Sequence, residues 1–149
     1  MREMIASQMK DAMKAGDKVR VSTLRMVMAA LKDREIEARG TGKALSEADE
    51  LALLTKMVKS RQESLGIYEQ AGGGELAAQE RAEIAIINEF LPRQMDEAAV
   101  TDAARAKIAE VGAASIKDMG KVVAALKAAY PGQMDFARAS AIVKGLLTA

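Results

Sequence analysis

The sequence predicts an all-α protein in two parts, an N-terminal bundle of long helices over residues 1–92 and a small C-terminal bundle of short helices over residues 93–149. Three observations lead to this prediction. Apolar residues recur at helical spacing along nearly the whole chain, and no segment alternates apolar and polar residues as a half-buried strand does. Glycine or proline stands where most of these patterns stop. The patterns are long before Pro92 and short after it, so Pro92 marks the predicted boundary.

Two helices are expected at the start of the chain. The first covers residues 1–15 and ends at Gly16, a residue suited to a helix C-cap. Asp17 is the expected N-cap of the second helix, which runs to about Arg39 and stops at the following Gly-Thr-Gly. The outer positions of this helix carry basic residues that the pattern assigns to ordinary solvated surface, namely Arg20, Arg25, Lys32 and Arg34.

A third helix carries an arginine on its apolar face. Ser46 and Asp49 form a capping-box pattern at its start. Arg61 stands on its apolar stripe, and a buried arginine is costly unless a carboxylate pairs with it. The next helix offers Glu80 and Glu83 on the matching face. We therefore expect a structural ion pair inside the bundle, with an anion-binding notch as the alternative.

The stretch from Glu75 to Pro92 is predicted to be the fourth helix, on which the rest of the bundle depends. Proline ends it, because proline has no N–H for the helical ladder. A glycine-rich turn, residues 71–74, joins it to the third helix. Neither a preceding strand nor a phosphate-binding fingerprint accompanies this turn, so it is not predicted to cradle a phosphate. The apolar stripe of the helix is expected to comprise Leu76, Ile84, Ile87, Phe90 and Leu91.

Three short helices are expected after Pro92. Asp96 is the predicted cap of the first, which ends at Gly112. A turn starting at Ser115 leads into the second, which Pro131-Gly132 terminates, and Asp135 is the predicted cap of the last. The second helix has a narrow apolar stripe made of Met119, Val122, Val123, Leu126 and Tyr130.

The composition excludes several classes of chemistry. The 149 residues contain no histidine and no cysteine, so serine–histidine and cysteine–histidine catalysis, disulfides and the usual zinc ligand sets are ruled out. The carboxylates are plentiful but scattered, and none pair as a general acid and base. We expect no catalytic residues, no metal and no cofactor. The start of the chain has no apolar signal core, and no run approaches the roughly twenty residues that span a bilayer. A cytoplasmic protein without membrane association is expected.

Charge is distributed unevenly although its total is only +1. Residues 1–61 contain thirteen Lys and Arg and nine Asp and Glu, whereas residues 62–91 contain one basic and six acidic residues. Residues 111–149 contain five basic and two acidic residues. A total near neutrality argues against a dedicated high-affinity nucleic-acid binder, yet the basic tail permits a modest electrostatic attraction of phosphate.

One helix face in the tail has the character of a phosphate contact. Lys117 and Lys121 are four residues apart and lie opposite the apolar stripe, beside Ala124 and Ala128, with Lys127 on the flank. Small neighbours leave room for close approach of a phosphate ridge, and lysine suits sequence-independent phosphate contact. A solvated, alanine-rich helix is the alternative interpretation.

Several stretches, in order along the chain, resemble the YqeY family, which also carries the label GatB/YqeY domain. They are LRMVMAALKDREIE (24–37), KSRQESLGIYEQAG (59–72), EFLPRQM (89–95), GAASIKDMGKVV (112–123) and IVKGLL (142–147). This family is similar to the C-terminal helical and tail region of the B subunit of the tRNA-dependent amidotransferase. The resemblance implies an all-helical fold and an association with carbon–nitrogen ligase activity that uses glutamine as amide donor.

The resemblance also implies contact residues for tRNA. Carried over by motif, they are Lys117, Met119, Gly120 and Lys121 in SIKDMGK and Lys144 in IVKGLL, and Lys127 completes the set expected from the helix face. The chain departs from the family at two turns: Gly132-Gln133-Met134-Asp135 lacks an arginine usual there, and the turn near Gly73 lacks a charge.

These inferences lead to one main hypothesis and two alternatives. The main hypothesis is a non-catalytic helical module that binds tRNA or a tRNA-handling enzyme. The alternatives are an accessory component of a glutamine-dependent carbon–nitrogen ligase, such as the tRNA-dependent amidotransferase, and a pure protein-interaction scaffold. The sequence leaves the oligomeric state open.

Overall fold

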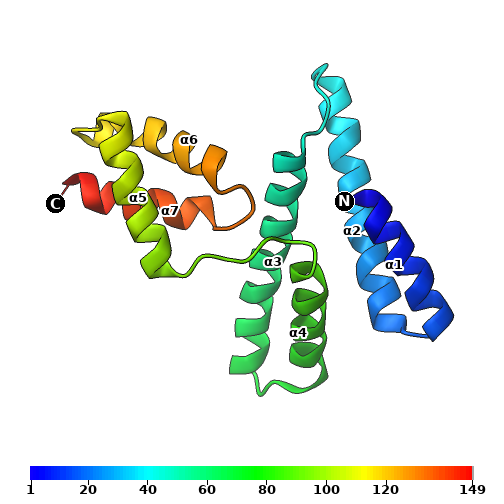
Figure 1. The fold of residues 1–149 in the computed structure, drawn as a ribbon. Helices are drawn as coiled ribbons and strands as arrows, with labels where there is room; N and C mark the ends of the chain where they lie inside the picture. Colours follow the sequence, from blue (N-terminus) through cyan, green and yellow to red (C-terminus); the bar gives the residue numbers. More distant parts are fainter. Residues whose placement is uncertain (149) are drawn as a thin grey trace. The chain divides into compact units, whose positions relative to one another are not determined.

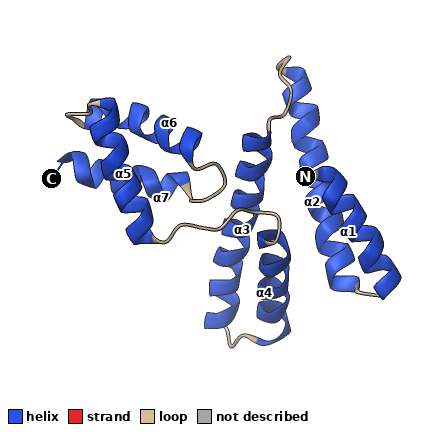
Figure 2. Ribbon diagram, viewed as in Figure 1, coloured by secondary structure: helices blue, strands red, loops and turns tan. Residues whose placement is uncertain are grey.

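The computed structural model describes residues 1–148, and within them the chain forms seven α-helices, one 3₁₀ turn and no strand (Figures 1 and 2). The all-α prediction is confirmed. The elements are α1 (Arg2–Ala15), α2 (Lys18–Gly40), α3 (Glu47–Gln70), α4 (Gly74–Asn88), α5 (Glu97–Val111), the 3₁₀ turn η1 (Ile116–Asp118), α6 (Met119–Ala129) and α7 (Phe136–Thr148).

The helix ends follow the predicted caps. Asp17 Oδ1 accepts the Arg20 amide at 3.1 Å at the start of α2. Ser46 and Asp49 exchange side-chain and backbone bonds, both of 3.1 Å, so the capping box of α3 is confirmed. Gly16 and Gly112 end α1 and α5 with φ of 71° and 69°, a left-handed conformation that glycine adopts without a Cβ clash.

The chain divides after Pro92 into two compact units, of which the first comprises Met1–Pro92. In this unit α1 pairs with α2, α3 pairs with α4, and α2 contacts both members of the second pair (Figure 1). Leucine, isoleucine and valine side chains from all four helices, with one phenylalanine, fill its core because an amphipathic helix must bury its apolar stripe. The buried core residues are Ile5, Leu24, Val27, Leu31, Leu54, Val58, Ile87 and Phe90.

Helix α4 ends earlier than its sequence pattern predicts. The pattern continued to Pro92, whereas the helix stops at Asn88. The next amides bond three residues back, as in a 3₁₀ turn: Phe90 donates to the Ile87 carbonyl at 3.0 Å and Leu91 to that of Asn88 at 3.2 Å. Proline has no amide to continue the ladder and disfavours helical geometry in the residue before it, so the last turn tightens instead.

The apolar stripe of α4 is also shifted at its start. Leu76, expected on the stripe, is 56% exposed, and Ala77 is fully buried in its place. The positive φ values of Gly73 (77°) and Gly74 (76°) set the direction in which the chain enters the helix. The buried stripe of α4 therefore begins at Ala77 and not at Leu76.

The second unit begins at Arg93 and has its own core. Helices α5, α6 and α7 contact one another pairwise, and η1 contacts α6 and α7. The segment that enters the unit is anchored at the α6–α7 turn, where the Met95 amide donates to the Gln133 carbonyl at 2.9 Å and Gln94 Nε2 to that of Gly132 at 2.7 Å. Its buried residues are Val100, Ala103, Ala104, Val122, Leu126, Met134, Ala139 and Val143.

The division after Pro92 rests on contacts between Cα atoms, and the two core clusters share no residue. That residues 1–92 and 93–149 are separately folding domains stays a prediction. Among residues 1–148, none of the helices is both long enough and apolar enough to span a bilayer.

Candidate nucleic-acid interface

The outward face of η1 and α6, here called the lysine face, is formed by Lys117, Gly120, Lys121, Ala124 and Ala128. All five residues are exposed. The opposite side of α6 buries Val122 and Leu126 in the core of the second unit. Helical periodicity therefore turns Lys121, Ala124 and Ala128 outward, since residues three and four apart share a face.

The 3₁₀ turn before α6 positions Lys117. Asp118 Oδ2 accepts the amides of Ala114 at 2.9 Å and Ser115 at 3.3 Å, which closes the turn. These two bonds, with a smaller contribution from the Lys121 charge, lower the pKa of Asp118 below its usual value. One carboxylate therefore stays ionised close to two lysines and offsets part of their charge.

The remaining predicted contact residues take different positions. Met119 is half-buried and packs against the core of the second unit, so its side chain does not join the lysine face. Lys127 Nζ lies 5.9 Å from the centre of the Phe136 ring, within the range of a cation–π contact. Lys144 is exposed on α7. The lysine face itself thus contains three of the predicted residues: Lys117, Gly120 and Lys121.

An exposed apolar residue adjoins the lysine face and was missed in the sequence pattern. Ile116, in η1 directly before Lys117, is 44% exposed. The contacts predicted in SIKDMGK are Lys117, Met119, Gly120 and Lys121. A single isoleucine outside a helical stripe carries no periodic signal. The face therefore combines positive charge with an apolar edge.

In the first unit, Arg61 pairs with Glu83 and not with Glu80. Arg61 Nε donates to Glu83 Oε2 at 3.2 Å, and the two side chains are only 14% and 13% exposed. The other guanidinium nitrogens donate to the Met57 carbonyl at 3.1 Å and to Met26 Sδ at 2.8 Å. All three guanidinium nitrogens are engaged, so the arrangement favours a structural ion pair over an anion-binding notch.

Glu80 has a different environment. Its Oε2 is buried and accepts no hydrogen bond within the described residues. Glu83 Oε1, by contrast, also accepts a bond from Gln79 Nε2 at 3.3 Å. The two glutamates lie three residues apart on α4, close enough that the sequence pattern could not choose between them.

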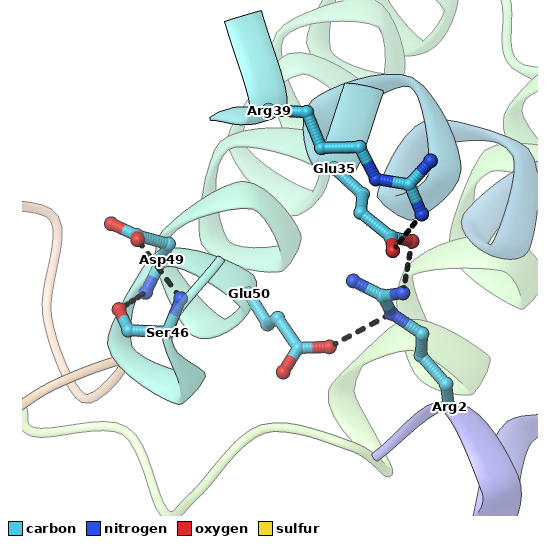
Figure 3. A network of polar contacts seen from close by, with 6 residues as sticks. All are labelled: Arg2, Glu35, Arg39, Ser46, Asp49 and Glu50. Carbon is cyan, nitrogen blue, oxygen red and sulfur yellow. Dashed lines mark hydrogen bonds and ion pairs between the residues drawn. The ribbon is translucent and has the colours of Figure 1, made fainter. Parts of the chain in front are cut away.

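A second charged network, absent from the sequence-based expectations, ties three helices of the first unit together (Figure 3). Arg2 of α1 bonds Glu35 of α2, and its Nε lies 3.4 Å from Glu50 Oε2 of α3. Arg39 Nη2 donates to Glu35 Oε1 at 2.8 Å. The bonds from Arg39 and then Arg2 lower the pKa of Glu35. Its members are up to 48 residues apart, so no local pattern signals it.

A hollow in the second unit lies between α5 and α7. It has a volume of about 330 Å³, and its wall includes Met95, Val100 and Ile142. At its rim Arg138 Nη2 pairs with Glu97 Oε2 at 2.6 Å, an exposed contact. Within residues 1–148 no cluster of three acidic side chains is arranged to hold a metal ion. Phosphate contact by the lysine face stays a prediction.

Comparison with known proteins gives one family and one curated relative. The family model described as Yqey-like protein matches residues 2–147. Altered inheritance of mitochondria protein 41, mitochondrial, from Lachancea thermotolerans is 31% identical over 90 residues, which are 58% of this chain and 46% of the relative. The chain therefore aligns to about half the length of this relative. Because the relative is named for mitochondria, a cytoplasmic location for this chain stays a prediction.

Proposed function

This chain belongs to the family of Yqey-like proteins, and on that premise we propose that it is a non-catalytic helical module that binds tRNA or an enzyme that handles tRNA. The observation that carries the proposal is the lysine face. Lys117 and Lys121 are exposed and engage in no ion pair within residues 1–148. The small residues Gly120, Ala124 and Ala128 share their face. Such a face suits the phosphate ridge of a folded RNA, which it would contact without reading bases.

The charge of the second unit supports the same proposal. The acidic segment, residues 62–91, belongs to the first unit, and the net positive segment begins at residue 111. A polyanion is therefore attracted more to residues 111–149 than to residues 62–91. Each lysine that neutralises one phosphate releases condensed counterions, which makes the affinity salt-dependent.

The test is titration of the full chain with tRNA at two salt concentrations. Lys117→Ala with Lys121→Ala should weaken binding and flatten the slope of log K against log salt by about 1.4–1.8, because two phosphate contacts are lost. Thermal unfolding should be unchanged, because neither side chain packs in the core. An equal loss of charge elsewhere in the unit, Arg93→Ala with Arg105→Ala, is the matched control.

The result of this comparison decides between the ligand classes. If the lysine-face variant binds tRNA with the affinity and slope of wild type, RNA is not the ligand of this face. The exposed Ile116 beside Lys117 then favours a protein partner, because an apolar edge next to charge is typical of protein interfaces. An accessory role in a glutamine-dependent carbon–nitrogen ligase is the second candidate, and capture of the tRNA-dependent amidotransferase by wild type but not by the variant would support it.

A further inference from the structure

Helix α2 carries a row of basic residues that the function proposed above does not use. Lys18, Arg25 and Lys32 follow one another at intervals of seven residues, and all three are exposed. Seven residues are almost two helical turns, so the three side chains lie on one side of the helix. At 1.5 Å per residue, successive members are about 10.5 Å apart and the row is about 21 Å long. We call this row the α2 ridge.

The surroundings of the α2 ridge leave it open to a large partner. The buried residues of the helix, among them Leu24, Val27 and Leu31, lie on the opposite side. Small residues, Ser22 and Ala29, occupy exposed positions beside the three cations. The exposed Ile36 lies one turn beyond Lys32, at the end of the row.

The ridge also differs from the other basic residues of α2 in lacking carboxylate partners. Arg20 is bound by Glu89 at 2.7 and 3.1 Å, Arg34 lies 3.5 Å from Glu37, and Arg39 is bound by Glu35. Within residues 1–148, no ion pair or side-chain hydrogen bond involves Lys18, Arg25 or Lys32. Their charges are therefore uncompensated by direct contact.

A hollow at the α1–α2 turn adjoins two members of the ridge. It has a volume of about 430 Å³ and is lined by Lys18, Arg25 and the hydroxyl-bearing Ser22, with Met13 and Val21 on its apolar wall. Asp17 also lines it, but Asp17 Oδ1 accepts the Arg20 amide as the cap of α2. Two cations and a hydroxyl around one hollow are the donors that a phosphate group requires.

We propose that the α2 ridge is a second phosphate-binding surface, separate from the lysine face, which binds the sugar–phosphate backbone of RNA and places one phosphate in the hollow. The row is about 21 Å long, so no single small anion reaches all three cations, and the ligand that contacts the whole row is an extended polyanion. The choice of RNA over other polyanions rests on the proposed function.

The experiment compares two charge-matched variants of the full chain. Lys18→Gln, Arg25→Gln and Lys32→Gln remove the ridge, whereas Lys10→Gln, Lys43→Gln and Lys56→Gln remove three exposed lysines elsewhere in the same unit. The probe is a fluorescein-labelled RNA duplex of roughly two turns, titrated by anisotropy at about 50 and 200 mM salt. The ridge variant should bind about tenfold more weakly at the lower salt and lose about 2.1–2.7 from its salt slope, since three phosphate contacts disappear. The control variant should keep the wild-type slope, and both should melt as wild type.

Four other outcomes would overturn the ridge proposal. They also show whether the function proposed for the lysine face fails with it. Equal losses in the two variants would show that net charge, not the ridge, determines affinity. Wild-type binding by the ridge variant, with loss in the Lys117→Ala, Lys121→Ala variant, would leave the lysine face as the RNA site. Absence of RNA binding by wild type would overturn the ridge and leave only an enzyme partner for the lysine face. Ridge-dependent binding to phosphatidylserine vesicles without RNA binding would assign the ridge to a membrane.

Discussion

Arg61 shows how a single buried charge is accommodated in a helical bundle. Its guanidinium is bound by Glu83 and by the Met57 carbonyl, so its desolvation is offset by charge and hydrogen bonding. We expect Arg61→Ala to lower the free energy of unfolding by about 3 kcal/mol, because Glu83 would remain buried without its partner. Urea unfolding followed by circular dichroism measures this change.

The control for this prediction is another arginine–glutamate pair between the same two helices. Arg81 Nη2 lies 2.7 Å from Glu69 Oε1, but these side chains are 55% and 48% exposed. Solvent screens such a pair, so Arg81→Ala should change stability by no more than about 0.5 kcal/mol. Equal effects of the two substitutions would contradict a buried structural role for Arg61.

At the scale of the elements, the contact of Arg2 with Glu35 and Glu50 fastens α1, α2 and α3 at one end of the first unit (Figure 3). The pKa of Glu35 is lower in the folded state than in the unfolded chain because of Arg39 and Arg2. The unfolded chain therefore takes up a proton at higher pH than the folded protein does. The stabilisation of the fold by ionised Glu35 is fully present above about pH 4.3. It is lost as the pH falls through the lowered pKa that Glu35 has in the folded protein.

The lowered pKa of Glu35 predicts a difference between the pH dependence of stability in wild type and in a Glu35→Gln variant. The melting temperature of wild type should fall more steeply below about pH 4.3 than that of Glu35→Gln, in which the titrating group is absent. At neutral pH the Glu35→Gln variant should be the less stable of the two. Glu3→Gln, at an exposed position without an ion pair among residues 1–148, should reproduce the wild-type profile. A Glu35→Gln profile parallel to wild type would show that the network does not stabilise the fold.

For the whole molecule, the two separate cores predict two folding units. The buried residues of the first core end at Phe90, and those of the second begin at Val100. Because each unit buries its own apolar surface, fragments 1–92 and 93–149 should each be helical and unfold cooperatively. Circular dichroism melts of the separate fragments test this. A fragment that is unfolded alone but folds when mixed with the other would show a single interdependent domain.

The amino-acid composition limits the catalytic chemistry that the chain can perform. Without histidine or cysteine, the chain offers no nucleophile–base pair of the usual kinds. The purified protein should release neither ammonia from glutamine nor phosphate from ATP above background. Assays of both products, on protein purified by two independent routes, measure this. Release of ammonia or phosphate that persists in the protein from both purifications would contradict the proposal that the chain is non-catalytic.

The number of helices, most of their ends and the exposure of Lys117 and Lys121 could be predicted from the amino-acid sequence. These features depend on interactions within a few residues: the 3.6-residue period, the side-chain caps at Asp17, Ser46 and Asp96, and the left-handed glycines. Exposure of the two lysines follows from the apolar stripe on the opposite side of α6. Their role in binding stays a prediction.

The contacts between residues of different helices could not be predicted from the sequence and depend on the tertiary packing. It selected Glu83 over Glu80 for Arg61 and placed Ala77 instead of Leu76 in the core. It also separated the basic residues of α2 into two classes, since Arg20 is neutralised by Glu89, 69 residues away, whereas the ridge is not. A local pattern shows that a charge is exposed or buried on its own helix. Whether that charge is compensated depends on the packing of distant helices, which no spacing within one helix encodes.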